Sequence, residues 1–262
     1  MTASLLMFLA AGLVGGLLLG MIGMGMALVA VPFVSFVLPR FGIPAEAVPL
    51  TAVATSMGIV AVGSVSSAIA HHRRGNVAWI IVKTMLPFGL AGMALGSLVA
   101  PLLPGGVLRW VFAGFLVFVA IGMLRPTRAG SEAPVQTSAA RYRGTGALIG
   151  VAGSLIGAGG GVFMVPFLDS RGHSMATAVA TSTVIGLPVT VLGTLLYAAQ
   201  PSGLDNAMLL GHVFLPAFIG ISLGSIVTAP LGARLASKVP GALLKRGFAT
   251  VLLILAARLA ME

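Results

Sequence analysis

Long apolar stretches recur along this chain, and they constrain its fold more than any other feature. Residues 3–38 are apolar almost without interruption. As one helix they would measure about 54 Å at 1.5 Å per residue, whereas the hydrocarbon core of a bilayer is about 30 Å thick. The first stretch must therefore be divided. Because stretches of 18 or more apolar residues follow it, the sequence predicts an all-α, polytopic membrane protein.

Composition and charge exclude several classes of function. Hydrophobic residues make up 58% of the chain and charged residues 8%, and the absence of cysteine excludes disulfides, thiol chemistry and cysteine-bound metals. The net charge of +10 comes mostly from basic residues in short connections, which the positive-inside rule explains without a nucleic-acid partner. The N-terminal apolar run is too long for a signal peptide and lacks a basic region before it, so we expect it to be retained.

Two matching segments point to a site. The segment from Gly20 to Phe33, GMIGMGMALVAVPF, recurs from Ser154 to Phe167 as SLIGAGGGVFMVPF. In each, a glycine cluster precedes a proline, and both residue types interrupt a helix. Such breaks are tolerated in a membrane only where protein or a water-filled cavity surrounds them. Broken segments at corresponding places in two halves are the best sequence indication of a transporter's binding site.

The repeat extends beyond these segments and divides the chain. Ala52–Ser56 recurs verbatim as Ala178–Ser182. Further matches follow in the same order: Leu86-Pro87 with Leu215-Pro216, and Gly92-xxx-Gly96 with Gly220-xxx-Gly224. We therefore predict two homologous membrane halves, residues 1–124 and 144–262, joined by the polar linker 125–143.

Each half contains a broken segment and three helices. After the first broken stretch, helices are expected at residues 45–70, 77–100 and 107–124; after the second, 144–168, they are expected at 173–199, 207–229 and 241–260. If the broken segments span the membrane, the basic residues other than Lys83 divide seven against seven. If they are re-entrant, eleven lie on one side (Arg73, Arg74, Arg125, Arg128, Arg141, Arg143, Arg171, Arg234, Lys238, Lys245, Arg246) and three on the other (Arg40, Arg109, Arg258). The second division favours re-entrant segments, inverted repeats and both termini outside.

The paired glycine-to-proline motifs, the Ala-Val-Ala-Thr-Ser repeat and the turn HHRRGNVAW at residues 71–79 resemble the TauE/SafE family of bacterial membrane transporters. The resemblance covers nearly the whole chain outside the linker. It implies a multi-pass protein of the bacterial inner membrane that moves sulfite, a sulfonate or a related organosulfur anion. The first half departs from the glycine-rich form at Met24 and Met26, so the resemblance does not fix the substrate. Because hydroxyls and backbone donors bind any oxyanion, another small anion, such as a carboxylate, is the alternative.

Glycines in the two breaks are the first candidate binding residues. Their backbone N–H groups, at the positive end of a half-helix, would hold an anion near the membrane midplane. The alternative is close helix packing by small residues. The candidates are Gly23 and Gly25 in the first half, and Gly157, Gly159, Gly160 and Gly161 in the second.

Hydroxyl side chains in the duplicated Ala-Val-Ala-Thr-Ser segments are the second set of candidates. Thr55, Ser56, Thr181 and Ser182 would donate hydrogen bonds to the oxygens of a sulfonate or sulfite. The alternative is that each hydroxyl bonds to a carbonyl of its own helix, which is common in membrane helices.

Three ionisable residues are candidates for proton coupling. Lys83 is the only basic residue clearly inside an expected helix, but it lies about one turn from Trp79 and would equally extend to the lipid headgroups. His212 is expected within a helix, either as a proton relay or as a structural histidine. Asp169 follows the second motif and would either carry a proton or pair with Arg171.

Enzyme activity is not expected. Gly220–Gly224 matches the G-x-S-x-G hydrolase pattern, but that pattern requires a strand-to-helix elbow that an apolar membrane helix does not provide. The chain contains neither a zinc-protease H-E-x-x-H motif nor a phosphate-binding G-x-x-x-x-G-K-[ST] motif. We therefore expect no catalytic residues, metal or cofactor, and a secondary transporter of a small anion.

Overall fold

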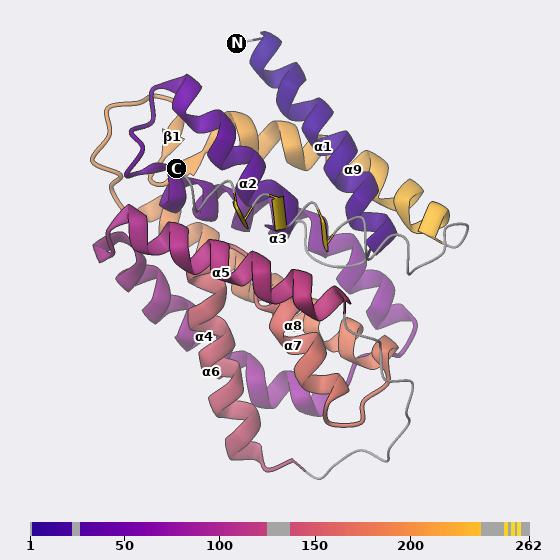
Figure 1. The fold of residues 1–262 in the computed structure, drawn as a ribbon. Coiled ribbons are helices and arrows are strands. Elements are labelled where there is room, and N and C mark those ends of the chain that lie inside the picture. The colour runs from indigo at the N-terminus through magenta and orange to yellow at the C-terminus, as the bar shows by residue number, and fades with distance from the viewer. Residues whose placement is uncertain are drawn as a thin grey trace.

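The computed structural model describes residues 2–22, 27–124 and 137–236, and near the C-terminus residues 249, 250, 253, 254, 256 and 257. Helices dominate the described chain, which confirms the all-α polytopic class (Figure 1). The first half contains α1 (Thr2–Ile22), α2 (Ala27–Val37), α3 (Val48–Arg73), α4 (Trp79–Val99) and α5 (Gly105–Leu124), with short 3-10 turns at Leu38–Phe41 and Ala100–Leu102. The second contains α6 (Ala139–Ile156), α7 (Gly161–Asp169), α8 (Met175–Ala199), the strands β1 (Leu209–Leu210) and β2 (Val213–Phe214), and α9 (Leu215–Ala236).

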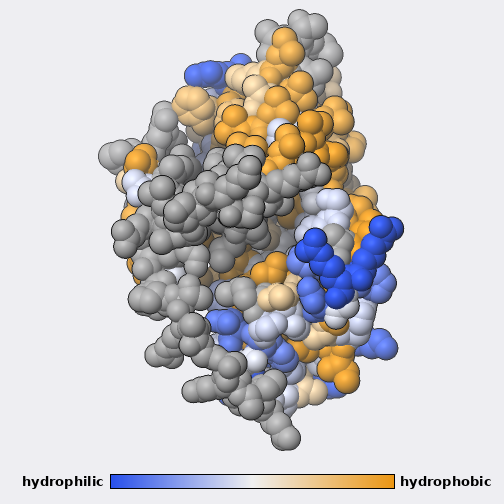
Figure 2. Space-filling view, turned by 90° about the vertical axis from the view of Figure 1, so that its right-hand side faces the viewer, coloured by the Kyte–Doolittle hydropathy of each residue, from blue (hydrophilic) through white to orange (hydrophobic). Residues whose placement is uncertain are grey.

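Four helical stretches of the described chain are long and apolar enough to cross a membrane: Val48–Arg73, Trp79–Leu102, Gly105–Gly122 and Ala176–Ala199. Shorter apolar stretches lie at Leu6–Leu17, Ala30–Phe41 and Leu215–Thr228. Large hydrophobic side chains such as Ile80, Leu102 and Leu148 are exposed to the surroundings. Figure 2 shows hydrophobic residues covering the upper part of one face, with hydrophilic residues gathered lower down. The protein is therefore a multi-pass membrane protein.

The second apolar segment is divided where the sequence predicts, and the first folds back between Phe8 and Phe33, whose ring centroids lie 6.4 Å apart. In the first half, α1 ends at Ile22 and α2 begins at Ala27, and Gly23 and Gly25 lie outside the described residues. In the second half, α6 ends at Ile156 and α7 begins at Gly161. Between them, Gly157, Gly159 and Gly160 have φ angles of +74°, +55° and +79°. Glycine is needed here because other L residues adopt this left-handed region only at a cost.

The second broken segment turns back on itself. Tyr142, in the first turn of α6, places its hydroxyl 3.2 Å from Nε2 of His173, which follows α7. The Tyr142 ring also meets the Phe167 ring of α7 edge-on, with centroids 5.9 Å apart. The segment therefore enters and leaves at the same end of the molecule, which is the geometry of a re-entrant hairpin.

Helices of one half pack along helices of the other. Figure 1 shows α1 beside α9 and α4 beside α6. Glycines allow close backbone approach in both pairs: Gly146 faces Met85 and Gly150 faces Gly89, while Gly12 faces Ile221 and Gly16 faces Ser225. Residue numbers rise together along each pair, so α4 runs parallel to α6 and α1 runs parallel to α9.

The two pairs run in opposite directions. The backbone N–H of Phe214, immediately before α9, donates to the Thr55 hydroxyl in the first third of α3. Helix α4 instead begins just beyond the far end of α3. Because α4 and α9 start at opposite ends of α3, their parallel partners α6 and α1 also run in opposite directions. The inverted orientation of the halves across a membrane stays a prediction, and these directions favour it.

The helix expected at residues 207–229 begins later than predicted. Residues 209–214 form a two-stranded hairpin in which Leu209 pairs with Phe214 and Leu210 with Val213. Gly211, with a φ of +56°, occupies the first turn position, where this type of tight hairpin requires glycine. The prediction that His212 lies in a helix was therefore wrong, because the Gly-His turn chemistry overrides the apolar pattern around it.

The structure also changes the alignment of the two repeats where α4 of the first half corresponds to α9 of the second. Pro87 lies inside α4, whereas Pro216 is the second residue of α9. Gly12 and Gly146 occupy the same position relative to the two glycine-to-proline motifs. Gly12 faces Ile221 and Gly146 faces Met85, so Met85 and Ile221 are structurally equivalent. The match of the two Leu-Pro pairs is therefore displaced from the structural register by about two helical turns.

Candidate functional site

The glycine turn of the second half, residues Gly157–Gly160, packs tightly against α3. The Ser56 hydroxyl donates to the Gly157 carbonyl, with the two oxygens 3.1 Å apart, and also approaches the Val53 carbonyl at 3.0 Å. A Cβ atom on Gly157 would lie 2.9 Å from that Val53 oxygen and still closer to the Ser56 hydroxyl. Glycine at this position thus provides both the left-handed backbone and the room for α3.

Three of the four candidate glycines of the second half are enclosed, and the fourth borders space that no described residue fills. A Cβ atom on Gly159 would meet the methyl group of Thr190 on α8, and one on Gly160 would meet Ile149 on α6. A Cβ atom on Gly161 would meet no described atom within 4 Å. The open side of this turn therefore lies at Gly161, at the start of α7.

Backbone donors converge at the same place. The N–H groups of Phe163 and Met164 bond to the Gly160 carbonyl at 3.1 and 3.0 Å, as expected inside a helix. Four successive N–H groups before them make no hydrogen bond to another described residue: those of Gly159, Gly160, Gly161 and Val162. Unbonded N–H groups and the positive end of a helix dipole suit an anion.

The candidate hydroxyls are engaged with backbone. Thr55 donates to the Thr51 carbonyl at 2.6 Å and Ser182 to the Val179 carbonyl at 3.0 Å, as the alternative interpretation of the sequence expects. Ser56 alone of the four is bonded to the glycine turn. A role of these hydroxyls toward substrate therefore stays a prediction, and it requires their present bonds to be exchanged.

Two of these threonines also accept hydrogen bonds from the opposite half. The Phe214 N–H donates to the Thr55 hydroxyl at 2.9 Å, and the Ala78 N–H donates to the Thr181 hydroxyl at 3.0 Å. Neither bond is visible in the sequence, because the partners are 159 and 103 positions apart.

Lys83 and Asp169 are exposed in the structure. The expected alternative for Asp169, an ion pair with Arg171, is not formed between these two described residues; the Arg171 guanidinium lies over the Phe167 ring, 5.5 Å from its centroid. An exposed Lys83 on the outer side of α4 fits the extension to lipid headgroups. Proton coupling through either residue stays a prediction.

His212 is buried, with 7% of its surface exposed. Its backbone N–H donates to the Tyr197 carbonyl at 2.9 Å, and its ring lies edge-on to the Tyr197 ring. Its Nε2 atom has no hydrogen-bond partner among the described residues.

Tyr197, which contacts His212, donates its hydroxyl to the Ser154 carbonyl of α6 at 2.9 Å. Tyr197 is not among the residues predicted from the sequence. The signal for it is a polar ring in an apolar helix, since a buried tyrosine hydroxyl needs a hydrogen-bond partner.

Burial lowers the pKa of His212 below its ordinary value of 6.5. The unfolded chain therefore takes up this proton first, and stability present above pH 6.5 is lost as the pH falls toward the lower folded-state pKa. We expect the free energy of unfolding of the detergent-solubilised protein to be lower at pH 5 than at pH 7.5, by about 1.4 kcal/mol for each unit by which the folded-state pKa lies below the unfolded one. The thermal midpoint should fall with it. His212→Gln should reduce this slope; an unchanged slope would show that His212 contributes nothing to it.

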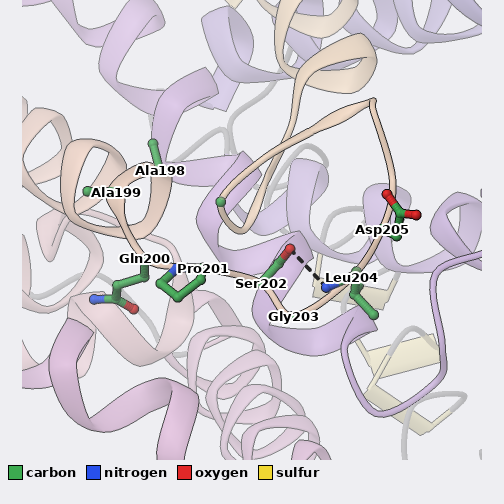
Figure 3. A pocket seen from close by; sticks show the side chains of 9 residues that line it. Ala198, Ala199, Gln200, Pro201, Ser202, Gly203, Leu204 and Asp205 are labelled. Carbon is green, nitrogen blue, oxygen red and sulfur yellow. Dashed lines mark hydrogen bonds between the residues drawn. The ribbon is translucent and has the colours of Figure 1, made fainter.

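One depression lies elsewhere on the described surface. It has a volume of about 510 Å³ and is lined by residues 198–205 and Gly211, between α8 and the hairpin (Figure 3). The Ser202 hydroxyl within it accepts a hydrogen bond from the Leu204 N–H at 3.3 Å. None of the residues predicted to bind substrate lines this depression. It is therefore separate from the glycine turn.

Helices long and apolar enough to cross a membrane, close packing between helices far apart in the sequence and the break between α6 and α7 define a polytopic membrane protein of the transporter class. A comparison with protein families agrees, since the model described as "Sulfite exporter TauE/SafE" matches residues 8–259. The chain belongs to the TauE/SafE family. The resemblance seen in its motifs is thereby confirmed.

Curated relatives are also named as membrane transporters. A "Probable membrane transporter protein" of Haemophilus influenzae is 30% identical over 256 residues, covering 96% of each chain. The "Probable membrane transporter protein YdhB" of Bacillus subtilis is 26% identical and covers 73% of this chain and 76% of its own. A similarly named protein of Xylella fastidiosa is 28% identical over 68% of this chain and 70% of its own. No solved structure matches the chain. The protein is a membrane transporter and not an enzyme.

Proposed function

We propose that this protein is a secondary transporter of a small oxyanion, sulfite or an organosulfur anion, which binds at the start of α7. The observation that carries the proposal is the row of four N–H groups from Gly159 to Val162 that make no hydrogen bond to another described residue, beside the space at Gly161 in which no described atom lies within 4 Å of an added Cβ. The name of the matching family model, a sulfite exporter, supports the substrate class.

Backbone N–H groups suit this substrate because several oxygens of one anion accept several donors at once. Charge-assisted hydrogen bonds of this kind are about twice as strong as neutral ones, and the helix dipole adds to them. The same donors bind a carboxylate, so the substrate panel below includes one. An anion bound here would also satisfy polar groups that are costly to leave unpaired in a membrane.

The first half is proposed to contribute an equivalent site element at Gly23 and Gly25. The opposite directions of α1 and α6 support a pseudo-two-fold arrangement in which both glycine clusters approach the membrane midplane. The bacterial inner membrane is the proposed location, on the strength of the family and its bacterial relatives. Coupling to protons is proposed with His212 as the buried candidate, and Asp169 and Lys83 as the exposed ones.

The proposal is tested by transport in proteoliposomes. Purified protein is reconstituted, and uptake is measured for sulfite, sulfoacetate, taurine, thiosulfate and acetate, with and without a pH gradient. We expect saturable sulfite or sulfonate transport that protein-free liposomes lack, and a dependence on the gradient if protons are coupled. Transport of acetate but of none of the sulfur anions would contradict the proposed substrate.

Gly161 allows a clean test of the site. Gly161→Ala and Gly161→Val add atoms where no described atom lies within 4 Å, and Gly161 is not among the glycines with positive φ. We therefore expect normal insertion and stability, but transport reduced roughly 10- to 100-fold, the effect of losing one hydrogen bond to a charged group. Gly114→Val, also in open space on α5, is the matched control. Normal transport by Gly161→Val would contradict the site.

A further inference from the structure

We propose that Thr55 and Thr181 form two equivalent gate contacts, one at each end of the protein, and that breaking one contact opens that end to the substrate. The inference rests on the proposed transport function but not on the identity of the anion. A gate contact here means the hydrogen bond from a backbone N–H at the start of a helix to the threonine hydroxyl of the opposite half.

The two contacts correspond in their place in the repeat, in their burial and in the position of the donor before a helix. Thr55 and Thr181 occupy the same place in the duplicated Ala-Val-Ala-Thr-Ser segment, and both are fully buried. Thr55 on α3 accepts from Phe214, the residue before α9, and Thr181 on α8 accepts from Ala78, the residue before α4. Each bond joins one half to the other. Such correspondence is not expected from threonines that only satisfy carbonyls of their own helices.

The donors are groups that need these partners. N–H groups at a helix start have no acceptor within their own helix. Ala78 is the N-cap residue of α4, and no side chain of its own caps that helix. A buried N–H left without an acceptor is costly, so each threonine stabilises the position of one helix start relative to α3 or α8.

The contacts lie at opposite ends of the molecule. The end of α3 leads directly to Ala78, and Ala78 meets Thr181 six residues into α8. The end of α3 and the start of α8 therefore lie together, whereas Thr55 lies in the first third of α3. With the basic turn at residues 71–78 on the cytoplasmic side, as the charge distribution predicts, the Thr181 contact faces the cytoplasm and the Thr55 contact faces outward.

Each contact controls a pair of helices. Helix α4 carries α6 along its length through close backbone packing, and α9 carries α1 in the same way. Breaking the Thr181 contact would release the start of α4 together with α6, which leads into the glycine turn. Both contacts are formed in this structure, which corresponds to both ends closed. A transporter with alternating access would open one at a time.

The test uses the absence of cysteine from the chain. A single Gly161→Cys substitution places a thiol in the open space, and a membrane-impermeant thiol reagent is applied to right-side-out and inside-out vesicles. We expect Thr181→Val to raise the labelling rate about tenfold from the cytoplasmic side only, and Thr55→Val to do so from the outside only, as expected for the loss of one hydrogen bond. Thr55→Ser and Thr181→Ser keep the hydroxyl and should label like the parent.

A second variant removes the donor instead of the acceptor. Ala78→Pro deletes the N–H at a position whose φ of −81° is close to that of proline. Ala78→Pro should raise the cytoplasmic labelling rate as Thr181→Val does, and the double variant Ala78→Pro with Thr181→Val should show no further increase in that rate. This comparison does not require that Thr55→Val is recovered in the membrane. Equal labelling from both sides, or additive effects in the double variant, would overturn the gate proposal. Sided labelling without transport of any sulfur anion would instead contradict only the proposed substrate.

Discussion

Gly159→Ala is expected to destabilise the protein by roughly 2–5 kcal/mol and to abolish most transport. The added Cβ would meet the Thr190 methyl group on α8, and the φ of +55° is itself unfavourable for alanine. Left-handed backbone costs about 1–2 kcal/mol and an overpacked methyl group about 1–3 kcal/mol. The effect is measured as a lower thermal midpoint in detergent, together with transport in proteoliposomes.

Thr190→Ser provides the matched control for Gly159→Ala. It removes the methyl group but keeps the hydroxyl, which donates to the Gly186 carbonyl at 2.9 Å. The double variant Gly159→Ala with Thr190→Ser should recover the packing part of the lost stability, while the backbone strain remains. If Gly159→Ala is as stable as the parent, the packing of this turn against α8 is not as described. Substitutions at Gly159 thus test the packing of the turn against α8, whereas substitutions at Gly161 test the proposed binding space.

Gly92→Ala is expected to weaken the α4–α6 interface by about 1–3 kcal/mol. The new Cβ would lie 2.9 Å from the carbonyl carbon of Ala147 and closer still to its oxygen, so two backbones would have to separate. Because α6 leads into the glycine turn, transport should fall in parallel with stability. The thermal midpoint and the transport rate of the same preparation test this.

Gly114→Ala on α5 is the control for the general effect of replacing a helical glycine by alanine. A Cβ atom there meets no described atom within 4 Å, and alanine favours a helix over glycine by about 0.5–1 kcal/mol. Gly114→Ala should therefore be neutral or slightly stabilising. A loss of stability equal to that of Gly92→Ala would show that glycine flexibility, and not close packing, matters in these helices.

Much of the fold is predictable because the membrane acts on local sequence. Hydrocarbon requires backbone groups to be satisfied within each segment, so apolar length alone located α3, α4, α5 and α8. The glycine cluster ahead of Pro166 likewise located the break between α6 and α7. These features depend on a residue's near neighbours and need no knowledge of what packs against them.

The candidate site was predictable only in part. Glycine clustering marked Gly157–Gly161, but it did not distinguish the enclosed Gly159 from the open Gly161. Such a distinction depends on Thr190 and Ile149, which reach the turn from α8 and α6. The hydroxyls of Thr55 and Thr181 were also identified from the repeat, while their N–H partners in the opposite half were not.

The sequence by itself determined the class of protein and the place of the break between α6 and α7, and it predicts two related halves. Apolar length, glycine and proline act locally, so these properties follow from the order of residues. Only the tertiary structure decided the pairing of α1 with α9 and of α4 with α6, the return of α7 to the start of α6, and the hairpin that buries His212. These depend on contacts between residues up to about 200 positions apart, where several registers satisfy the same apolar pattern and close packing selects one.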